Sequence, residues 1–530
     1  MLSRRVCRVW PLVWICAAIG VAQLSAVPQH TALLAADTPG QFVLNARRQV
    51  ETSPASGRFH TLTQPVEWPA AQTAVVICDM WDQHWSPTAT RRVAEMAPRM
   101  NEVVAEARRR GALIIHCPSD TLSFYEGTPQ RERARQAPPV ATAIPLERWC
   151  RLMPEKEGKL PIDDSDGGCD AVPQGKNHKA WSRQIATLEI HPEDAITDSN
   201  EAFYLMKARG IRHVLVMGVH TNMCVLGRPF SIRQMVRQGQ EVILVRDMTD
   251  TMYNPRMAPF VHHCTGTDLV VEHIERHWCP TVTTTDFIGG REFRFSEDQR
   301  PHLAILMAED EYKTEVSLPA WGRAHLGKEF RTTYLYGNDA ERNDLPGLEA
   351  LETADVLLVS VRRRVPSAAQ LARIRKFIEA GKPVVGIRTA SHAFSLRDGT
   401  PPPEGHSAWL TFDPDVLGGH YTGHHGVGPK VAVSLPAEPP HPILAGVDLA
   451  QLQGHGSLYK VSPLAISATP LLLGTIPDTP VEPLAWVYTN RYGGRVFYTS
   501  LGHIDDFAEP AFQRLLLNGV RWAAGLRTDG

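Results

Sequence analysis

The chain has 530 residues, of which 43% are hydrophobic and 21% are charged, and its formal net charge at pH 7 is -2. This length exceeds what one hydrophobic core usually supports, so we expect two large domains. The composition excludes wholesale disorder, and the nearly neutral charge gives no electrostatic reason to expect nucleic acid as a partner.

The first residues have the layout of a secretory signal peptide. Three arginines precede an apolar run at 9–21, and small residues follow near Ala26 and again near Ala36. We therefore predict a signal peptide within residues 1–36 and export of the mature chain to the periplasm or the exterior. If the run is not cleaved, it would instead act as an N-terminal anchor.

Residues 37–70 lack periodicity and predict an exposed lead-in segment with one short strand near 42–44. Residues 71–285 then alternate apolar runs typical of buried strands with segments of helical spacing. Such alternation predicts an α/β domain with a mainly parallel sheet and helices on both faces.

Two of these apolar runs end next to residues that can carry chemistry. TAVVICD ends in Asp79, and VLVMG ends at Gly218, so that Cys224 falls at the start of the next helix. An acid at the carboxyl end of a strand lies where open α/β sheets place their active sites. A helix N-terminus lowers the pKa of a thiol, which predicts Cys224 as a nucleophile; the alternative is an ordinary small buried residue.

The strand that ends in Asp, followed later by G-V-x-T-N-x-C-V, resembles the isochorismatase-like cysteine hydrolases, which include nicotinamidases. The resemblance implies Asp79 as the general base and Cys224 as the nucleophile. It also implies a cis peptide before His220, and backbone N–H groups of His220 and Cys224 that bind an oxyanion.

The chain departs from this family at the catalytic lysine. The segment DAITD corresponds to the strand that ends in Lys, and Asp198 occupies the place of the Lys. Lys179 is the nearest upstream substitute, although a lysine in a loop is usually just solvated.

The stretch 118–194 predicts a long irregular insertion, either a lid over Cys224 or a disordered loop. Asp82, His84 and His116 could form a metal site like that of nicotinamidases, but no tight ligand spacing supports it, so we predict neither metal nor cofactor. The expected substrate-binding residues of this domain are Trp81, His84, His116, His220 and Asn222.

Nine cysteines are present, and Cys7 and Cys16 lie in the predicted signal peptide. The odd number that remains leaves at least one thiol unpaired, as a nucleophile must be. Cys150 and Cys169 could form a disulfide in an oxidising compartment.

A second α/β alternation begins after a junction that we place at 285–300, and the second domain is predicted at 300–527. Its segment GIRTASH, at 386–392, has the strand-to-helix placement of a nucleophile elbow. It resembles the turn of class I glutamine amidotransferases, with Arg388 in place of the Cys. Arginine has no usable lone pair, which excludes thiol chemistry there.

The run at 492–526, together with VLGGHYTGHHG, resembles the ThuA-like (trehalose-utilisation) domains, which share the amidotransferase fold and are associated with sugar metabolism. The resemblance implies His503 as the best polar candidate of this half. Four other histidines could converge on it: His392, His420, His424 and His425.

Two functions remain open from the sequence. In the first, the protein is an exported hydrolase of a non-peptide C–N bond in a small molecule, with Asp79 and Cys224 at its centre. In the second, the ThuA-like half binds or processes carbohydrate and the first half is a scaffold. Oligomerisation through the isochorismatase-like domain is also expected to be possible.

Overall fold

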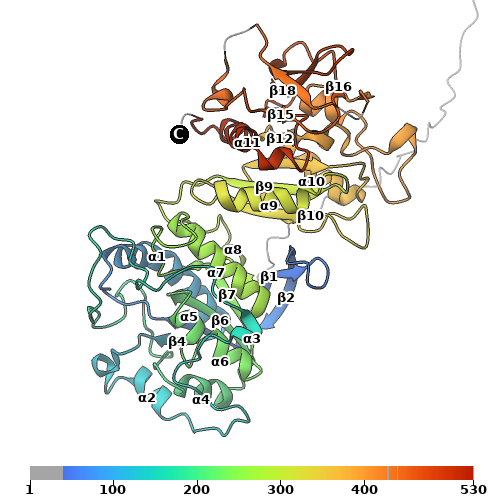
Figure 1. Ribbon diagram of the computed structural model, residues 1–530. Coiled ribbons are helices and arrows are strands. Elements are labelled where there is room, and N and C mark those ends of the chain that lie inside the picture. The colour runs from blue at the N-terminus through green and yellow to red at the C-terminus, as the bar shows by residue number, and fades with distance from the viewer. Residues whose placement is uncertain (1–39, 427–428, 438–439, 529–530) are drawn as a thin grey trace, which may run out of the picture. The chain divides into compact units, whose positions relative to one another are not determined.

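The computed structural model describes residues 40–426, 429–437 and 440–528 (Figure 1). The predicted signal peptide lies outside these residues. Within them, no helix combines the length and the apolar character that crossing a membrane requires.

An eight-stranded sheet with the order β2-β1-β8-β7-β6-β3-β4-β5 forms the core of the first half. Neighbouring strands from β8 to β5 are parallel. Its strands are β1 (Gln41–Glu51), β2 (Phe59–Pro69), β3 (Thr73–Cys78), β4 (Leu113–Cys117), β5 (Ala195–Ile196), β6 (His213–Val219), β7 (Glu241–Asp250) and β8 (Thr281–Val282). Every residue of β3 is buried, as its continuous apolar run predicts.

Helices cover both faces of this sheet. Val75 and Ile77 of β3 pack in one hydrophobic cluster with α1, whereas Ala74 and Val76 pack in another cluster with α4 and α6, because successive side chains of a strand point to opposite faces. The helices of this half are α1 (Pro87–Arg110), α2 (Pro129–Arg135), α3 (Pro154–Glu157), α4 (Glu201–Ala208), α5 (Cys224–Gly227), α6 (Ile232–Arg237), α7 (His263–His277) and α8 (Thr285–Ile288), with the short 3₁₀ turns η1 (Ala70–Gln72) and η2 (Leu122–Tyr125).

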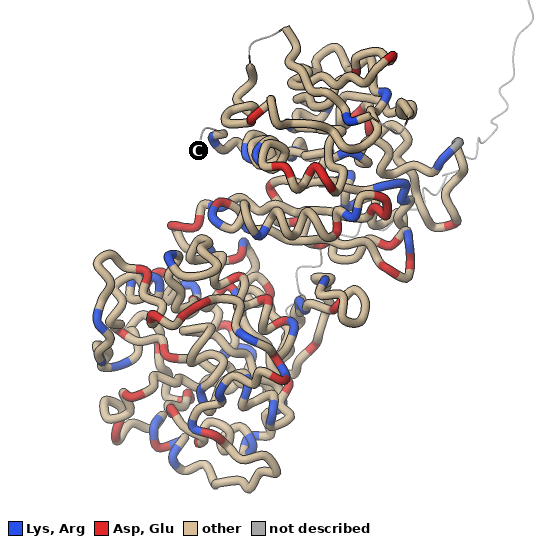
Figure 2. Tube along the Cα trace, in the orientation of Figure 1, with Lys and Arg blue, Asp and Glu red and all other residues tan. Residues whose placement is uncertain are grey.

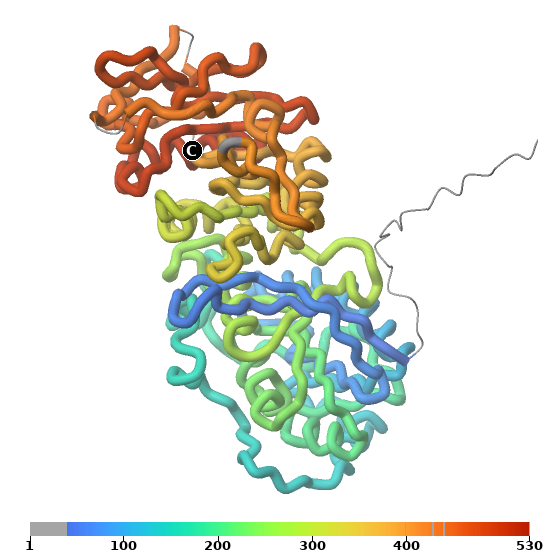
Figure 3. Tube along the Cα trace, turned by 90° about the vertical axis from the view of Figure 1, so that its right-hand side faces the viewer, coloured from blue at the N-terminus to red at the C-terminus, as the bar shows by residue number. Residues whose placement is uncertain are grey.

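The lead-in segment differs from its prediction. In place of one short strand, β1 and β2 form an antiparallel hairpin of two 11-residue strands, which Figure 3 shows side by side in blue. Phe42 and Leu44 of β1 are fully buried in the cluster around α1. The hairpin therefore extends the sheet through the single β1–β8 pairing instead of standing free of it.

A nine-stranded sheet, ordered β10-β9-β11-β12-β19-β18-β17-β14-β15, forms the core of the second half. The pairs from β10 to β19 are parallel and those from β19 to β15 are antiparallel. Its strands are β9 (His302–Ala308), β10 (Arg331–Tyr336), β11 (Val356–Val361), β12 (Val384–Ile387), β14 (Val431–Ser434), β15 (Gln453–Gly454), β17 (Thr469–Thr475), β18 (Glu482–Thr489) and β19 (Arg495–Thr499); β13 (Gly423–His424) and β16 (Tyr459–Lys460) pair separately.

Helices again lie on both faces of this sheet. Side chains of α9 (Thr314–His325) and α11 (Pro510–Ala523) belong to one hydrophobic cluster, and those of α10 (Ala368–Glu379) belong to the other. Short helical turns complete the half: η3 (Leu348–Glu352), η4 (Arg388–His392), η5 (Arg397–Gly399), η6 (Asp413–Leu417), η7 (Pro442–Leu444) and η8 (Asp506–Ala508). The predicted fold class, two α/β sheets with helices on both faces, is confirmed.

Basic and acidic residues are intermingled along the trace of both halves (Figure 2). The last helix of the first half, α8, ends at Ile288, and the first strand of the second half begins at His302. The domain boundary at 285–300 stays a prediction.

Candidate active site

Asp79 follows the last residue of β3 and is fully buried. Its φ of +47° lies in the left-handed region, which non-glycine residues rarely adopt. Its Oδ1 accepts a hydrogen bond from the N–H of Ser119 at 2.8 Å, and its backbone N–H donates to the carbonyl of Cys117. The carboxylate is therefore held firmly at the carboxyl edge of the sheet.

Cys224 begins the one-turn helix α5, four residues after the first residue beyond β6. Its side chain is 8% exposed and lies close enough to the carboxylate of Asp79 for each group to act on the pKa of the other. Gly218 allows β6, which leads to Cys224, to lie close to β3, which leads to Asp79. The φ of Gly218 is +110°, and a Cβ there would lie 2.0 Å from the carbonyl oxygen of Cys78 in β3. The structure thus brings the predicted base and the predicted nucleophile together.

Arg228 supplies the cation of this cluster. Its Nε lies 3.2 Å from Oδ2 of Asp79, and its charge also acts on the pKa of the Cys224 thiol. It caps the C-terminus of α5, four residues after Cys224, and its guanidinium stacks at 5.5 Å on the ring of Trp149 from the insertion. The sequence patterns above did not single out Arg228, although the i, i+4 spacing in CVLGR is a signal that could have identified it.

The thiol of Cys224 does not have the lowered pKa that its place at a helix start led us to expect. Burial raises the pKa of Cys224 well above its usual value, the charge of Asp79 raises it further, and Arg228 opposes both effects. Burial also raises the pKa of Asp79, and Arg228 holds that increase back. A single helical turn offers little dipole against these two effects, so the neutral thiol of Cys224 is favoured over the thiolate in the resting site.

The peptide bond between Val219 and His220 is cis, as the family resemblance implied. Within the described residues, the backbone N–H groups of His220 and Cys224 have no hydrogen-bond partner. The loop between them is fixed by the N–H of Thr221, which donates to the carbonyl of Asp250 at 2.8 Å. Two free N–H groups beside a thiol can bind a negatively charged oxygen.

Aromatic rings form a wall beside this site. The ring of Trp81 stacks on that of Trp181 at 4.3 Å, and His84 lies 5.7 Å from Trp181 and 5.0 Å from His220. Burial lowers the pKa of His84 to about 4 and that of His220 to about 3, so both rings are neutral at pH 7. Nε2 of His220 and Nε1 of Trp181 are buried without a partner among the described residues.

The insertion carries Trp181 onto this wall and fixes it there. Asp82 accepts hydrogen bonds from the N–H and the hydroxyl of Ser182. Lys179 donates to the carbonyl of Asp120 at 2.7 Å, and its side chain is exposed. The cation beside Asp79 is therefore Arg228, and Lys179 serves to tie the insertion to Asp120.

Asp198 accepts a hydrogen bond from the N–H of Asp120 at 3.0 Å, and Oδ2 of Asp120 lies 3.7 Å from Arg228. The residue at the family's lysine position thus helps to fix the rim of the site instead of supplying a cation.

His116 and Asn222 have partners that leave them no free polar atom for a substrate. His116 is fully buried, with its ring nitrogens bonded to Gln184 at 3.0 Å and to Asp194 at 3.1 Å. Asn222 bonds Asp164 and both backbone groups of Met252. The geometry therefore supports a structural role for both residues in place of the predicted contact with substrate.

Asp82, His84 and His116 do not form a common ligand set, since each is engaged with different partners. In the described part of the chain, one group has the spacing of a metal site: His262, Cys264 and Asp298. Asp298 is already paired with Arg300, and His262 accepts a hydrogen bond from the N–H of Cys264, so this group is occupied by protein contacts.

The cysteines proposed as a disulfide are both free. The thiol of Cys150 donates to Gln234 and that of Cys169 donates to Ser86.

In the second half, the chain at the carboxyl ends of β12 and β19 carries the polar residues that the sequence singled out. Arg388 follows β12 with a φ of +41° and is 3% exposed. The side chain of His503 is 27% exposed, and its ring meets that of Tyr312 edge-on at 5.6 Å. The ring of His392 is tilted against that of Tyr421, with the ring centres 4.4 Å apart.

The other three histidines have separate partners instead of a common centre at His503. His420 pairs with Asp413, His424 contacts the hydroxyl of Tyr421, and His425 lies 3.4 Å from Glu482.

Comparison with protein families matches residues 323–523 to the ThuA family, described as trehalose utilisation. The second half contains a ThuA domain. The matched residues include the elbow at Arg388 and the turn at His503, so both lie inside the domain.

Several solved structures are similar to part of this chain. A ThuA-like protein from Bacteroides uniformis has 16% identity and a TM-score of 0.33, over 44% of this chain and 95% of that one. A cysteine hydrolase from Pseudomonas syringae has 18% identity and a TM-score of 0.27, over 42% and 92%. An isochorismatase from Pseudomonas putida has 14% identity and a TM-score of 0.26, over 41% and 91%. A search of curated protein sequences finds no match to this chain.

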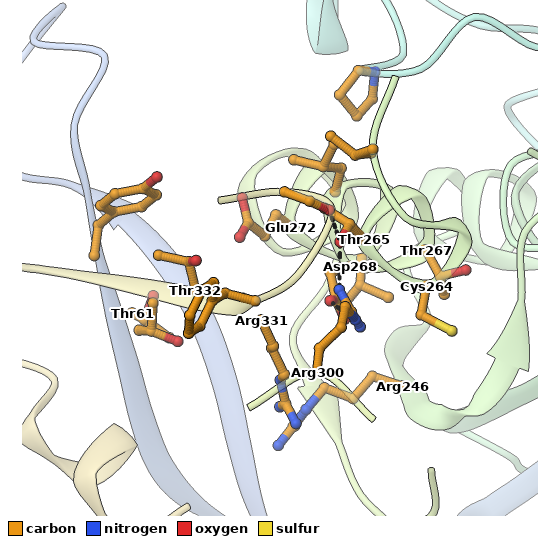
Figure 4. Close-up of a pocket in the computed structure, with 18 of the residues that line it drawn as sticks. Thr61, Arg246, Cys264, Thr265, Thr267, Asp268, Glu272, Arg300, Arg331 and Thr332 are labelled. Carbon is orange, nitrogen blue, oxygen red and sulfur yellow. Dashed lines mark hydrogen bonds and ion pairs between the residues drawn. The ribbon is translucent and has the colours of Figure 1, made fainter. Parts of the chain in front are cut away.

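Figure 4 shows residues that line a cavity of about 430 Å³. Neither Cys224 nor Arg388 is among the residues that line it. Several charged side chains that line this cavity are paired with one another. Arg300 lies 3.1 Å from Asp268 and also donates to the hydroxyl of Thr265, and Arg331 is paired with Glu292.

Proposed function

We propose that the first half hydrolyses a non-peptide C–N bond in a small amide. The observation that supports this function is the buried contact of a carboxylate, a thiol and a guanidinium, contributed by Asp79, Cys224 and Arg228. A nucleophile within hydrogen-bond reach of a base, with a third group that holds the base, is the arrangement that covalent catalysis needs.

In this mechanism, Asp79 takes the proton of the Cys224 thiol as the sulfur attacks the amide carbonyl. The oxygen of the tetrahedral intermediate is held by the N–H groups of His220 and Cys224. Asp79 then returns the proton to the leaving nitrogen, and the C–N bond breaks to leave a thioester. Asp79 next deprotonates a water, which attacks the thioester and releases the acid and the thiol.

Arg228 has the role that the missing lysine has in the resembling family. Although burial alone would lower the pKa of Arg228, the charge of Asp79 raises it, so the guanidinium stays protonated throughout the reaction. Its charge stabilises the thiolate as that forms and limits the rise in the pKa of Asp79. It does not shuttle protons, and this leaves Asp79 as the single proton carrier.

The test is ammonia or amine release from a panel of small amides by the purified chain. We expect Cys224→Ser and Asp79→Asn to abolish turnover. We expect Arg228→Gln to lower kcat/KM by about a hundredfold and Arg228→Lys to recover most of it, since one preorganised charge is typically worth ~10²–10³ in rate. Lys179→Ala is the matched control, with activity within about twofold of the wild type. Turnover that survives Cys224→Ser would refute the proposal.

A second candidate function belongs to the ThuA domain. The family match and the tyrosines and histidines at the carboxyl edge of its sheet favour a carbohydrate-related ligand there.

Export from the cytoplasm also remains a proposal, which rests on the sequence of residues 1–36.

A further inference from the structure

Arg388 occupies the position that a nucleophile would take in the elbow of the ThuA domain. It follows β12 directly, its φ is +41°, and its carbonyl accepts a hydrogen bond from the hydroxyl of Tyr498 at 2.6 Å. A long side chain in a left-handed conformation costs conformational energy and persists where surrounding contacts enforce it. The site therefore holds a guanidinium at the carboxyl edge of the parallel strands, where α/β folds bind ligands.

The guanidinium is buried among neutral partners. Nη1 donates to the carbonyl of Ser500 at 2.7 Å, and Nη2 donates to the hydroxyl of Tyr312 at 3.0 Å. Two longer contacts, both 3.4 Å, join Nη2 to the carbonyl and the hydroxyl of Ser457. Nε has no partner in the part of the chain that the structure describes.

Tyrosine rings flank the guanidinium on two sides. Its Cζ lies 4.2 Å from the ring centre of Tyr312 and 4.6 Å from that of Tyr459. Cation–π contacts recover part of the cost of burying a charge, but a buried cation without an anion still carries a desolvation cost of several kcal/mol.

The charge of Asp506 raises the pKa of Arg388, but the carboxylate oxygens of Asp506 already have other hydrogen-bond partners. Oδ1 accepts from the N–H and the ring of His455, and Oδ2 accepts from the N–H groups of Gly502 and His503. Glu311 reaches Arg388 only through Tyr312, whose hydroxyl donates to it at 3.1 Å. No carboxylate among the described residues is hydrogen-bonded to this guanidinium.

Other arginines surround the same edge. Burial, together with the charges of Arg363, Arg362 and Arg388, lowers the pKa of His392 to about 3, so that ring is neutral at pH 7. Arg362 is itself paired with Glu311. The neutral rings of His392, Tyr421 and Tyr459 lie within 6 Å of one another beside Arg388.

We propose that this edge of the ThuA domain binds a small sugar-like ring that carries a carboxylate or phosphate, with Arg388 as the partner of the anion. The anionic oxygen would replace the long contacts to Ser457 and reach the free Nε, approaching past the partly exposed ring of His503. The aromatic rings would take the apolar face of the sugar. This proposal rests on the second candidate function, a carbohydrate-related ligand of the ThuA domain, and it does not depend on hydrolysis at Cys224.

The test is calorimetric titration of the full-length chain with glucuronate, with glucose 6-phosphate and with glucose as the neutral counterpart. We expect at least one anionic sugar to bind ten or more times more tightly than glucose; the preferred one identifies the anion as carboxylate or phosphate. Arg388→Gln should abolish this preference, and Arg491→Gln, which changes an exposed arginine of the same domain, should keep it.

Tyr312→Phe is a second variant that tests the proposal in case Arg388→Gln fails to fold. It removes only the hydroxyl that holds Nη2, and we expect the preference to fall several-fold while the unfolding midpoint changes little. Equal affinity for glucose and for both anionic sugars in the wild type would overturn the proposal, as would a preference that survives in a folded Arg388→Gln variant.

Discussion

Asp79 and Arg388 have the same backbone feature at the scale of single residues. Each directly follows a buried parallel strand, and each is a non-glycine residue with φ between +41° and +47°. Such conformations gather at functional sites, because the surrounding structure must hold them in place. In the first half the feature presents a base, and in the second half it presents a guanidinium.

Alkylation of Cys224 should report the balance of charges around its thiol. Since the charge of Asp79 raises the pKa of Cys224, Asp79→Asn lowers that pKa and should speed labelling by iodoacetamide at pH 7 by about tenfold or more. Arg228→Gln should slow it. The measurement is the rate at which the peptide that contains Cys224 gains mass, followed by mass spectrometry.

Lys179→Ala is the control for this experiment, and it should leave the rate unchanged because Lys179 is bonded to Asp120. Cys78 and Cys117, both fully buried, should label more slowly than Cys224 throughout. A labelling rate of Cys224 that is unchanged in Asp79→Asn would show that Asp79 does not act on the thiol.

At the scale of elements, the close approach of β6 to β3 determines where Cys224 can lie. Gly218→Ala would place a Cβ 2.0 Å from the carbonyl oxygen of Cys78, at a φ of +110°. We expect the free energy of unfolding to fall by more than about 3 kcal/mol, because the clash is with backbone that cannot move without breaking the strand pairing. Urea denaturation followed by circular dichroism measures this loss.

Gly210→Ala is the control that measures the cost of a positive φ without a steric clash. Gly210 also has a positive φ, +67°, but a Cβ there would meet no atom within 4 Å. Its substitution should cost about 1 kcal/mol. Equal losses in the two variants would mean that contact with β3 does not matter.

At the scale of the whole molecule, the residues of the proposed hydrolase site all come from positions 79–228. A protease site introduced between Gly289 and Gly290, which both have positive φ values, should therefore allow cleavage with amide hydrolysis kept within about twofold. Activity before and after cleavage is the measurement.

A cut at Lys176–Asn177 is the contrasting case. This exposed stretch leads into Trp181, whose ring stacks on Trp81 beside the site. Cleavage there should lower kcat/KM several-fold, because it frees one end of the segment that carries Trp181. If the cut at Gly289 abolishes activity and this one does not, the site depends on more of the chain than we propose.

The sequence by itself determined the alternation of strands and helices, and with it the edge of the sheet at which Asp79 and Cys224 lie. Continuous apolar runs identify buried parallel strands, and parallel strands bring their carboxyl ends to one edge. It predicted only a short strand near 42–44 within β1 and missed β2, because the sequences of both strands lack the apolar continuity of a central strand.

Only the tertiary structure decided which cation faces Asp79 and which rings enclose the site. Arg228 reaches Asp79 because the one-turn helix α5 directs its side chain back to β3. Trp181 lies 100 residues after Trp81 in the chain, and the hydrogen bonds that fix the insertion bring the two rings together. Burial likewise reversed the expected pKa shift of Cys224. Periodicity in one sequence records which residues face a core, whereas contacts between distant segments and the desolvation they cause depend on how the elements pack.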